Sequence, residues 1–315
     1  MLSWVWRRLA AVHERLLRRE IDAAPTHVAV IQDGNRRYAR KRGDRPTAGH
    51  RAGAETTERV LEWCEDLGVE ELTLYALSTE NFDRPDDELD PLFDLIESKL
   101  REFADADRVH ENGVRIRAIG DLDRLPPRVR DAVTYAEERT AGYDGFRLNV
   151  ALAYGGRAAL LSAARAVVRD AHDGALDPAD VDAAEVESRL ARGPSRDVDL
   201  IIRTGGDERT SNFLPWHANG NEAAVYFCAP YWPEFSKPDF LRGIRTYESR
   251  EASWRRTRAE RAATLVGVVA DTSVGEARAV AARLRETLAP SGRGETAVDV
   301  DLDGRFADRT EADAD

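Results

Sequence analysis

The stretch HVAVIQDGNRR, residues 27–37, joins an apolar run to a glycine turn and a basic segment. Within the predicted strand, residues 27–32, four successive apolar residues fill positions 28–31, which is typical of a strand buried on both faces of a parallel sheet. Asp33 and Gly34 end this run, and the arginine-rich residues after them predict a helix. A strand that passes through a glycine turn into a helix indicates an α/β fold.

The same pattern recurs along the chain. Five further apolar runs predict strands over residues 72–78, 114–119, 146–152, 199–203 and 223–228. Helical periodicity lies between them, over residues 56–67, 92–103, 127–138 and 158–172. We therefore expect one α/β domain with a six-stranded, mostly parallel sheet flanked by helices. Ligands of such sheets bind beyond the carboxyl ends of the strands.

Composition excludes several classes of protein. The longest apolar runs, such as residues 28–31 and 265–270, are too short to cross a bilayer, and residues 1–8 lack the charge order of a signal peptide. Cys64 and Cys228 lie far apart, so we expect no disulfide framework or zinc site, and a cytoplasmic location. The formal net charge of −12 argues against nucleic-acid binding.

Basic residues are almost all arginine, because lysine occurs only at Lys41, Lys99 and Lys237. An acidic, lysine-poor chain indicates a halophilic protein, since a strongly hydrated acidic surface keeps proteins dissolved at high salt. A GC-rich genome would also favour arginine over lysine. Both explanations are compatible with the composition.

The two ends of the chain differ in charge. Residues 1–45 carry eleven Lys or Arg against five Asp or Glu, whereas residues 290–315 carry eight acidic residues against three arginines. Residues 1–24 predict a basic amphipathic helix, which either packs on a protein surface or lies on a membrane. Residues 25–256 form the predicted catalytic domain. Residues 257–315 predict a helical extension and an acidic, partly disordered tail.

The first polar cluster follows the first strand. A helix that begins after Gly34 presents N–H groups to an anion, and Arg37 and His50 can add charge-assisted hydrogen bonds. Asp33 would repel a bare phosphate, so its presence there favours a bridging cation such as Mg²⁺. Taken alone, the cluster is explained better by Asp33 as a helix cap with solvated arginines beside it.

Two more polar clusters follow later strands. Residues 75–85 carry Ser, Glu, Asn and Arg after the second strand, and residues 201–212 carry two glycines between arginines after the fifth. Arg203 and Arg209 can both reach one diphosphate, and the glycines let the backbone approach it. Three strand ends with anion donors and a carboxylate together describe a site for two diphosphates and a metal.

Five ordered motifs in these clusters resemble the cis-prenyltransferases, whose best-known members are the undecaprenyl diphosphate synthases. The motifs are DGNRR at residues 33–37, GHRAG at 49–53, STENFDRP at 78–85, YGGR at 154–157 and RTGGDERTSNF at 203–213. The resemblance covers residues 27–256. It implies a homodimer, a six-stranded parallel sheet and a hydrophobic tunnel beside it.

The resemblance also implies an activity. Such enzymes lengthen an allylic diphosphate, here geranylgeranyl or farnesyl diphosphate, with isopentenyl diphosphate units in a Mg²⁺-dependent reaction. The product is a long-chain, undecaprenyl-type diphosphate, a precursor of a glycosyl carrier lipid. The expected location is the cytoplasm, and the N-terminal helix leaves open a peripheral association with the inner face of the cell membrane.

Site residues follow from the resemblance, position by position. Asp33 and Glu222 would hold the metal, and Asp33 would also handle the allylic diphosphate. That diphosphate would be lined by Gly34, Asn35, Arg36, Arg37, Tyr38 and His50. The allylic substrate would be positioned by Ser78, Thr79, Glu80, Phe82 and Arg84. Isopentenyl diphosphate would be held by Arg203, Arg209, Thr210 and Ser211.

Several positions depart from the family pattern. Asn81 is the family's candidate for proton removal, but a carboxamide is a very weak base and a diphosphate oxygen is a better acceptor. Pro46 stands where the family commonly has arginine, with Arg45 beside it. An apparent insertion within residues 217–225 weakens the assignment of Glu222.

A second metal motif must be weighed, because residues 86–90 match D-D-x-x-D of the all-helical trans-prenyltransferases. The predicted strands and the preceding Arg84-Pro85 favour instead a turn and an acidic helix start. Two other functions remain as alternatives. One is a non-catalytic partner subunit, although such subunits lack the aspartate motif retained here. The other is a peripheral membrane scaffold that uses the two ends of the chain.

Overall fold

The computed structural model describes residues 14–15, 17–190, 192–218 and 223–253. The predictions for the acidic tail, for most of the N-terminal helix and for Glu222 lie outside these residues. Residues 14, 15 and 17–19 are helical, as the amphipathic pattern predicts, and Leu17 is buried. Within the described part of the chain, no helix has the length and apolar character that a membrane span requires.

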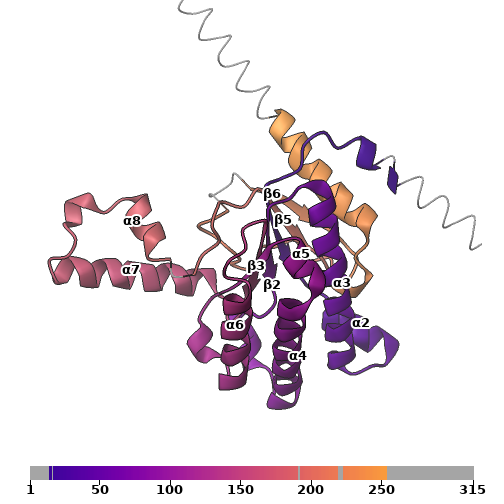
Figure 1. The fold of residues 1–315 in the computed structure, drawn as a ribbon, viewed down its shortest axis with the longest axis horizontal. Coiled ribbons are helices and arrows are strands. Elements are labelled where there is room, and N and C mark those ends of the chain that lie inside the picture. The colour runs from indigo at the N-terminus through magenta and orange to yellow at the C-terminus, as the bar shows by residue number, and fades with distance from the viewer. Residues whose placement is uncertain (1–13, 16, 191, 219–222, 254–315) are drawn as a thin grey trace, which may run out of the picture. The chain divides into compact units, whose positions relative to one another are not determined.

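A six-stranded sheet forms the centre of the described part (Figure 1). Its strands are β1 (His27–Ile31), β2 (Glu71–Tyr75), β3 (Val114–Ile119), β4 (Phe146–Ala151), β5 (Leu200–Arg203) and β6 (Ala224–Phe227), in the order β3-β4-β2-β1-β5-β6. Every pairing recorded between these strands is parallel. The α/β fold with a six-stranded sheet is therefore confirmed.

Helices connect the strands, as parallel pairing requires. They are α2 (Asn35–Arg42), α3 (Pro46–Leu67), α4 (Asp86–Asp105), α5 (Asp107–Glu111), α6 (Pro127–Arg139), α7 (Gly156–His172) and α8 (Ala183–Ser188). Short 3₁₀ turns lie at Thr79–Asp83, Leu122–Arg124, Pro178–Asp180 and Trp232–Glu234, and residues 237–253 are helical.

Helix α3 begins ten residues before the predicted start at residue 56. Pro46 occupies its first turn, where proline is tolerated because that N–H has no partner in a helix. The glycines that obscure the helical pattern serve close packing instead. A Cβ atom at Gly49 would lie 2.0 Å from the carbonyl oxygen of Asn35, so only glycine lets α3 approach α2 here.

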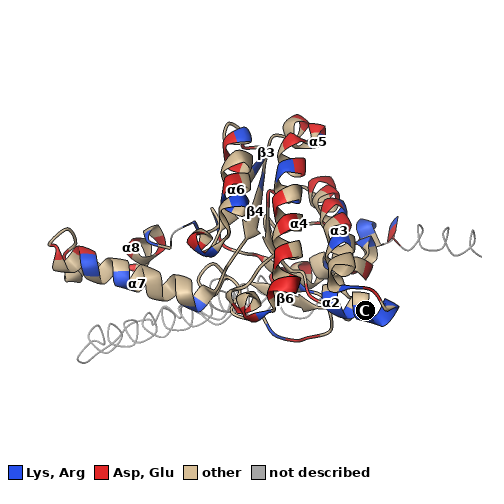
Figure 2. Ribbon diagram, turned by 90° about the horizontal axis from the view of Figure 1, so that it is seen from below, with Lys and Arg blue, Asp and Glu red and all other residues tan. Residues whose placement is uncertain are grey.

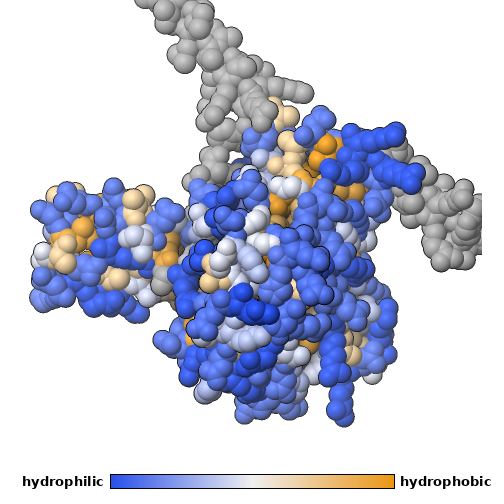
Figure 3. All heavy atoms as spheres, viewed as in Figure 1, coloured by the Kyte–Doolittle hydropathy of each residue, from blue (hydrophilic) through white to orange (hydrophobic). Residues whose placement is uncertain are grey.

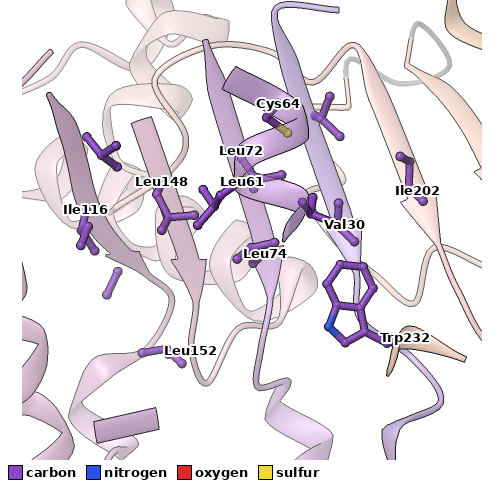
Figure 4. Close-up of a cluster of buried hydrophobic side chains, with 14 of the residues drawn as sticks. Val30, Leu61, Cys64, Leu72, Leu74, Ile116, Leu148, Leu152, Ile202 and Trp232 are labelled. Atoms are coloured by element: carbon purple, nitrogen blue, oxygen red, sulfur yellow. The ribbon is translucent and has the colours of Figure 1, made fainter. Parts of the chain in front are cut away.

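The central strands β1, β2 and β5 are buried at every position, whereas β3 alternates buried apolar residues with the more exposed Arg115 and Arg117. Val28 and Val30 of β1 belong to the larger hydrophobic cluster with α3, α4 and α6, part of which Figure 4 shows. Ala29 and Ile31 point the other way, into a smaller cluster with Phe213 and Leu214. The loop after β5 therefore covers one face at the carboxyl edge, and the helices cover the other.

The register of the strands places the three polar clusters at the same edge of the sheet. Ile31 at the end of β1 pairs with Tyr75 of β2 on one side and with Arg203 of β5 on the other. The residues that follow these strands therefore meet at the same edge. Strand β1 is also the point where the chain order reverses, and ligands of open α/β sheets bind at such a point.

Trp232 packs between this edge of the sheet and α3, so a variant at this position tests how much the packing stabilises the fold. It is fully buried, its indole Nε1 donates to the Gly53 carbonyl at 2.8 Å, and its ring stacks on Phe235. We expect Trp232→Ala to lower the free energy of unfolding by about 3–5 kcal/mol, measured by denaturant unfolding. The matched variant Glu55→Ala, at an exposed position of α3, should change it by less than about 0.5 kcal/mol.

Candidate active site

Asp33 lies two residues beyond β1 and is held by arginines from two elements. One oxygen, Oδ1, accepts from Arg37 of α2 at 2.9 Å, and Oδ2 accepts from Arg203 of β5 at 2.6 Å. The backbone is fixed as well, because the Asp33 carbonyl accepts from the Thr204 hydroxyl at 2.8 Å and from the Trp232 N–H at 3.0 Å. Asp33 thus has the geometry of an ion-pair centre and not of a helix cap.

Arg203 is the most buried cation of the site, with a side chain only 4% exposed. Besides Asp33, its guanidinium donates to the Ser211 hydroxyl and to the Arg209 carbonyl, so it orders the loop that follows β5. Its Nε is buried and has no hydrogen-bond partner among the described residues. Because burying a guanidinium requires compensation, the negative charge of Asp33 is essential here.

Asp207 was not among the predicted site residues, yet it joins the same cluster. Its Oδ2 lies 3.2 Å from Arg209, 3.4 Å from Arg203 and 3.6 Å from Arg37. The spacing gave a signal that could have found it: Asp207 is four residues after one arginine and two before another, in a glycine turn. Two carboxylates and three guanidinium groups therefore alternate at the carboxyl edge.

The charge state of Asp33 follows from these partners. Burial alone would raise its pKa, but the hydrogen bonds and charges of Arg203 and Arg37 outweigh burial, so the pKa of Asp33 is lowered. Asp33 is therefore a carboxylate at neutral pH. Such a group can accept hydrogen bonds or ligate a cation, but it is a weak general base.

Two glycines make this arrangement possible. Gly34 has φ +102°, and a Cβ atom there would lie 2.7 Å from the ring of Tyr231. Gly205 has φ +88°, and a Cβ atom there would lie 2.7 Å from Nη2 of Arg37. Both positions require glycine for conformation and for space, so the turns after β1 and β5 can close on one another.

A polar cavity of about 700 Å³ opens beside Asp33. Four arginines line it against three carboxylates, those of Asp33, Asp44 and Glu88, and Figure 2 shows α2 as a basic segment of the chain. Among the predicted residues it is lined by Asp33, Gly34, Asn35, Arg36, Arg37, His50 and Arg84. The guanidinium of Arg84 has no ion pair recorded among the described residues, and burial followed by repulsion from Arg36 lowers its pKa. The cavity therefore suits an anion.

His50 lies at the inner end of the polar cavity. Burial, and then the positive charges of Arg84 and Arg36, lower its pKa to about 4. The imidazole is therefore neutral at pH 7 and can donate one hydrogen bond to an anion. Its own charge would appear only when a bound anion outweighs the neighbouring arginines.

An apolar tunnel continues from the polar cavity. Three residues, Gln32, Asn35 and His50, line both spaces. Beyond them the tunnel runs between α3, α4 and one face of the sheet, and it is lined by apolar residues that include Leu74, Leu92, Leu95, Ile96, Leu100, Phe103, Ile116, Leu148 and Val150. An anion site that opens into an apolar tunnel matches a ligand with a charged head and a hydrocarbon tail.

The second motif is built around a turn after β2. Ser78 and Asn81 form a reciprocal capping box, in which the Asn81 side chain accepts from the Ser78 N–H at 3.0 Å. Thr79 donates its N–H to the carbonyl of Tyr154, which links this turn to the YGGR motif. Glu80 is exposed. Within the described structure, the visible role of Asn81 is to shape the turn that presents Arg84.

The third motif is an exposed loop tied down by Arg203. The Arg209 side chain is 67% exposed, Thr210 is half-buried, and Ser211 accepts from Arg203. Asn212 accepts from the N–H groups of Gly156 and Arg157, so the loop also depends on the YGGR motif. Arg203, Arg209 and Ser211 lie together, as the motif predicts.

Five residues predicted for the allylic substrate do not line the polar cavity: Tyr38, Ser78, Thr79, Glu80 and Phe82. The two aromatic residues among them pack elsewhere. Tyr38 lies under the guanidinium of Arg42, 4.3 Å from it, and is not part of the polar cavity lining. Phe82 packs against Phe93 and under Arg124, at 6.0 Å and 4.4 Å between group centres. Both can support the walls of the site without lining the cavity.

A metal would have few protein ligands here. Within the described residues, no three His, Cys, Asp or Glu side chains are grouped closely enough to hold an ion. Mg²⁺ fits this supply, because it is commonly bound by one or two carboxylates together with substrate phosphates and waters. Asp33 is 28% exposed at the side chain and lines the polar cavity, so it would be the carboxylate ligand.

The D-D-x-x-D match lies at the start of α4. Asp86, Asp87 and Glu88 form the first turn of this helix, where negative charge stabilises the exposed N–H groups. Glu88 pairs with Arg36 of α2 at 3.1 Å, and the Asp90 side chain is 70% exposed. This geometry supports the interpretation as an acidic helix start.

Comparison with known proteins identifies the family of the chain. A family model described as "Putative undecaprenyl diphosphate synthase" matches residues 31–255. Tritrans,polycis-undecaprenyl-diphosphate synthase (geranylgeranyl-diphosphate specific) of Halobacterium salinarum is 72% identical, over 91% of this chain and 95% of its own. The protein of the same name from Haloarcula marismortui is 59% identical, over 96% and 99%.

Solved structures show the same fold. Lavandulyl diphosphate synthase from Lavandula x intermedia, in complex with dimethylallyl diphosphate, superimposes with a TM-score of 0.66 at 33% identity, over 71% of this chain and 95% of that chain. A probable undecaprenyl diphosphate synthase from Campylobacter jejuni gives 0.58 at 33% identity, over 72% and 96%. The chain belongs to the cis-prenyltransferase family, and it is a transferase of prenyl groups.

The low pKa of His50 can be tested directly. We expect the NMR signal of the His50 ring in the free protein to titrate near pH 4, and pyrophosphate to raise the midpoint by about one unit or more, because it adds negative charge beside the ring. His50→Asn assigns the signal. A midpoint near 6.5 without pyrophosphate, or no change on its addition, would contradict the site described here.

Proposed function

We propose that this protein is a Mg²⁺-dependent enzyme that condenses isopentenyl diphosphate units with geranylgeranyl diphosphate to make a long, undecaprenyl-type polyprenyl diphosphate. One observation supports the proposal above the others: the basic cavity at Asp33 and the apolar tunnel share Gln32, Asn35 and His50 as a common wall. An allylic diphosphate has the matching division into an anionic head and an apolar tail.

The primer is proposed from the relatives. Those from Halobacterium salinarum and Haloarcula marismortui carry "geranylgeranyl-diphosphate specific" in their names. At 72% and 59% identity over nearly the whole chain, the same primer is the best proposal for this protein. Farnesyl diphosphate, which is shorter, is the alternative primer for the assay below.

The diphosphate of the allylic substrate would lie in the polar cavity. Arg37, Arg84 and His50 surround that space, and the turn at Gly34 presents the first N–H groups of α2 to it. Arg36 lines the same cavity, and its guanidinium is already paired with Glu88, so it would contribute less to the diphosphate than Arg37 and Arg84. Gly34, Asn35 and Tyr38 would form the wall and its support.

Isopentenyl diphosphate would bind next to it, at the loop after β5. Arg203 and Arg209 are the cations there, and Thr210 and Ser211 offer hydroxyl groups. Asp33 pairs with Arg203, so the two diphosphates would share one charged centre. With both diphosphates at this centre, the isopentenyl double bond would lie close to the allylic carbon.

The residues of the site would assist the loss of the allylic diphosphate. Mg²⁺, when bound, neutralises charge on that leaving group. Arg37 and Arg84 would hold the departing diphosphate as its negative charge develops. The apolar tunnel would exclude water from the cation-like carbon, and the isopentenyl double bond would attack it. Asn81 accepts from Ser78 and would position the turn, while a diphosphate oxygen takes the proton.

We also propose a biological setting. The product would serve as a precursor of a glycosyl carrier lipid in a halophilic cytoplasm, which the net charge of −12 suits. Residues 1–24 would allow peripheral contact with the cell membrane, residues 25–256 would form the catalytic domain, and residues 257–315 would extend it. Glu222 would be a second metal ligand. Arg45, beside Pro46, lines a groove outside the polar cavity.

A homodimer is proposed because α7 and the segment between α7 and α8 leave apolar side chains uncovered. Leu161 and Val168 of α7 are 57% and 66% exposed, and Val181, between the two helices, is 38% exposed. Figure 3 shows hydrophobic atoms among hydrophilic ones over α7 and α8. Exposed large hydrophobic side chains on an alanine-rich helix are typical of a protein interface. A second copy of the chain is the occupant that the family resemblance implies.

The activity can be tested with purified protein, labelled isopentenyl diphosphate, Mg²⁺ and each primer in turn. We expect elongation with geranylgeranyl diphosphate, and a loss of about 10³-fold in kcat for Asp33→Asn, because the variant removes the charge that pairs with Arg203 and would bind Mg²⁺. Chromatography of the labelled products provides the measurement.

The double variant Asp86→Asn with Asp87→Asn is the matched control, since both carboxylates lie at the exposed start of α4. It should retain more than about half of the activity. A collapse comparable to that of Asp33→Asn would restore the D-D-x-x-D motif as the metal site. Absence of elongation with either primer, at high and at low salt, would overturn the proposed function.

The proposed interface predicts a change of mass. Leu161→Glu with Val168→Glu should convert a dimer into a monomer in size-exclusion chromatography with light scattering, because charge would be buried between the copies. Ser98→Glu adds the same charge to α4 and should leave the dimer intact. A monomeric wild-type protein, or an unchanged mass in the double variant, would reject this interface.

A further inference from the structure

The apolar tunnel is narrow in relation to the product proposed above. Its volume is about 120 Å³. An engineered apolar cavity of about 150 Å³ binds a single benzene molecule, and one isoprene unit has nearly as many carbon atoms as benzene. A polyprenyl chain therefore needs the tunnel to widen, and the question is which wall yields.

The sheet side of the tunnel cannot yield easily. Leu74, Ile116, Leu148 and Val150 lie on β2, β3 and β4, which pair continuously in parallel register. Moving one of these strands would break several backbone hydrogen bonds at once, each costly to leave unmade in a dry interior. The wall that can move is the helical one.

The helical wall is thin where α3 meets α4. Leu95 lines the tunnel, and it also lines a groove of about 770 Å³ on the outer side of the same two helices. At this point one side chain separates the two spaces. Helix α4 packs more extensively on α6 than on α3, so the α3–α4 boundary is the weaker of its two contacts.

One turn beyond Leu95, an ion pair crosses this boundary. Lys99 of α4 lines the tunnel, and its Nζ lies 3.0 Å from Glu58 of α3 and 2.8 Å from Glu102 of its own helix. The Lys99 side chain is 26% exposed. Within the described residues, no other ion pair joins α3 to α4.

We propose that Lys99 and Glu58 together close the tunnel wall between α3 and α4, and that this ion pair determines how far the polyprenyl chain grows. The proposal rests on the proposed function. A growing chain that reaches this depth must part the two helices, and parting them separates Lys99 from Glu58. It also places hydrocarbon against a charged group that would lose one of its two partners. Both effects oppose the next elongation step.

The opposing force depends on the charge of Glu58. The Glu58 carboxylate joins the helices, whereas Glu102 belongs to the same helix as Lys99 and moves with it. Loss of Glu58 therefore frees the boundary, and loss of Glu102 does not. This difference separates a tunnel wall from a general surface effect, because both carboxylates contact the same amine.

The experiment compares the products of wild type, Glu58→Gln, Lys99→Met and Glu102→Gln in full-length protein. Each enzyme is given geranylgeranyl diphosphate, labelled isopentenyl diphosphate and Mg²⁺, and products are compared at equal consumption of isopentenyl diphosphate. We expect Glu58→Gln and Lys99→Met to shift the main product upward by one or more isoprene units, and Glu102→Gln to retain the wild-type product. Thermal unfolding of each variant verifies that it is folded.

Three outcomes would overturn the inference while leaving the proposed function intact: unchanged product lengths in Glu58→Gln and Lys99→Met, shorter products in these variants, or an equal shift in Glu102→Gln. Failure of the wild type to elongate either primer would instead reject the proposed function. The double variant Glu58→Gln with Lys99→Met gives an independent check. It should shift product length no further than the larger single shift, because both single variants remove the same link.

Discussion

The ion pair between Asp33 and Arg203 is the interaction on which the carboxyl edge of the sheet depends. Arg203 is almost completely buried, and a buried guanidinium without its partner costs on the order of 3–5 kcal/mol. Asp33 supplies the compensating charge, which in turn lowers the pKa of Asp33. The same pair joins the end of β1 to β5 at the point where the sheet order reverses. One ion pair therefore stabilises the fold and forms the centre of the candidate site.

The rest of the site follows from this contact. Arg37, Arg203 and Arg209 would repel one another if they faced water alone, and the two carboxylates of Asp33 and Asp207 balance them at 2.6–3.6 Å. Arg84 and His50 are not included in this balance, and their pKa values are lowered by burial and by neighbouring cations. The free protein thus has its unbalanced positive potential on the side of the polar cavity where Arg84 and His50 lie.

The sequence predicted the fold well because the central strands β1, β2 and β5 are fully buried and the outer strands still carry buried apolar residues at regular positions. Residues 114–119 were predicted with the observed bounds, and the three polar clusters do meet at one edge. The start of α3 was missed because Gly49 weakens helix propensity, and its close approach to Asn35 is visible only in three dimensions. Asp207 was missed for the same reason: its role depends on the distance to Arg37, which lies on another element.

In the high-salt cytoplasm proposed for this protein, screening by salt limits which of these charges can attract a substrate. The Debye length is about 3 Å at 1 M salt, so charges on α2 and α4 attract or repel little beyond contact distance. Direct pairs inside the site are screened much less, because Arg203 and Asp33 touch at 2.6 Å and exclude water. Long-range steering therefore contributes little to substrate capture, and the net charge of −12 acts on solubility. Recognition of a diphosphate must then come from contact with the partly buried cations. Recognition of the tail must come from the shape and apolar lining of the tunnel, because salts that are excluded from protein surfaces strengthen the burial of apolar groups.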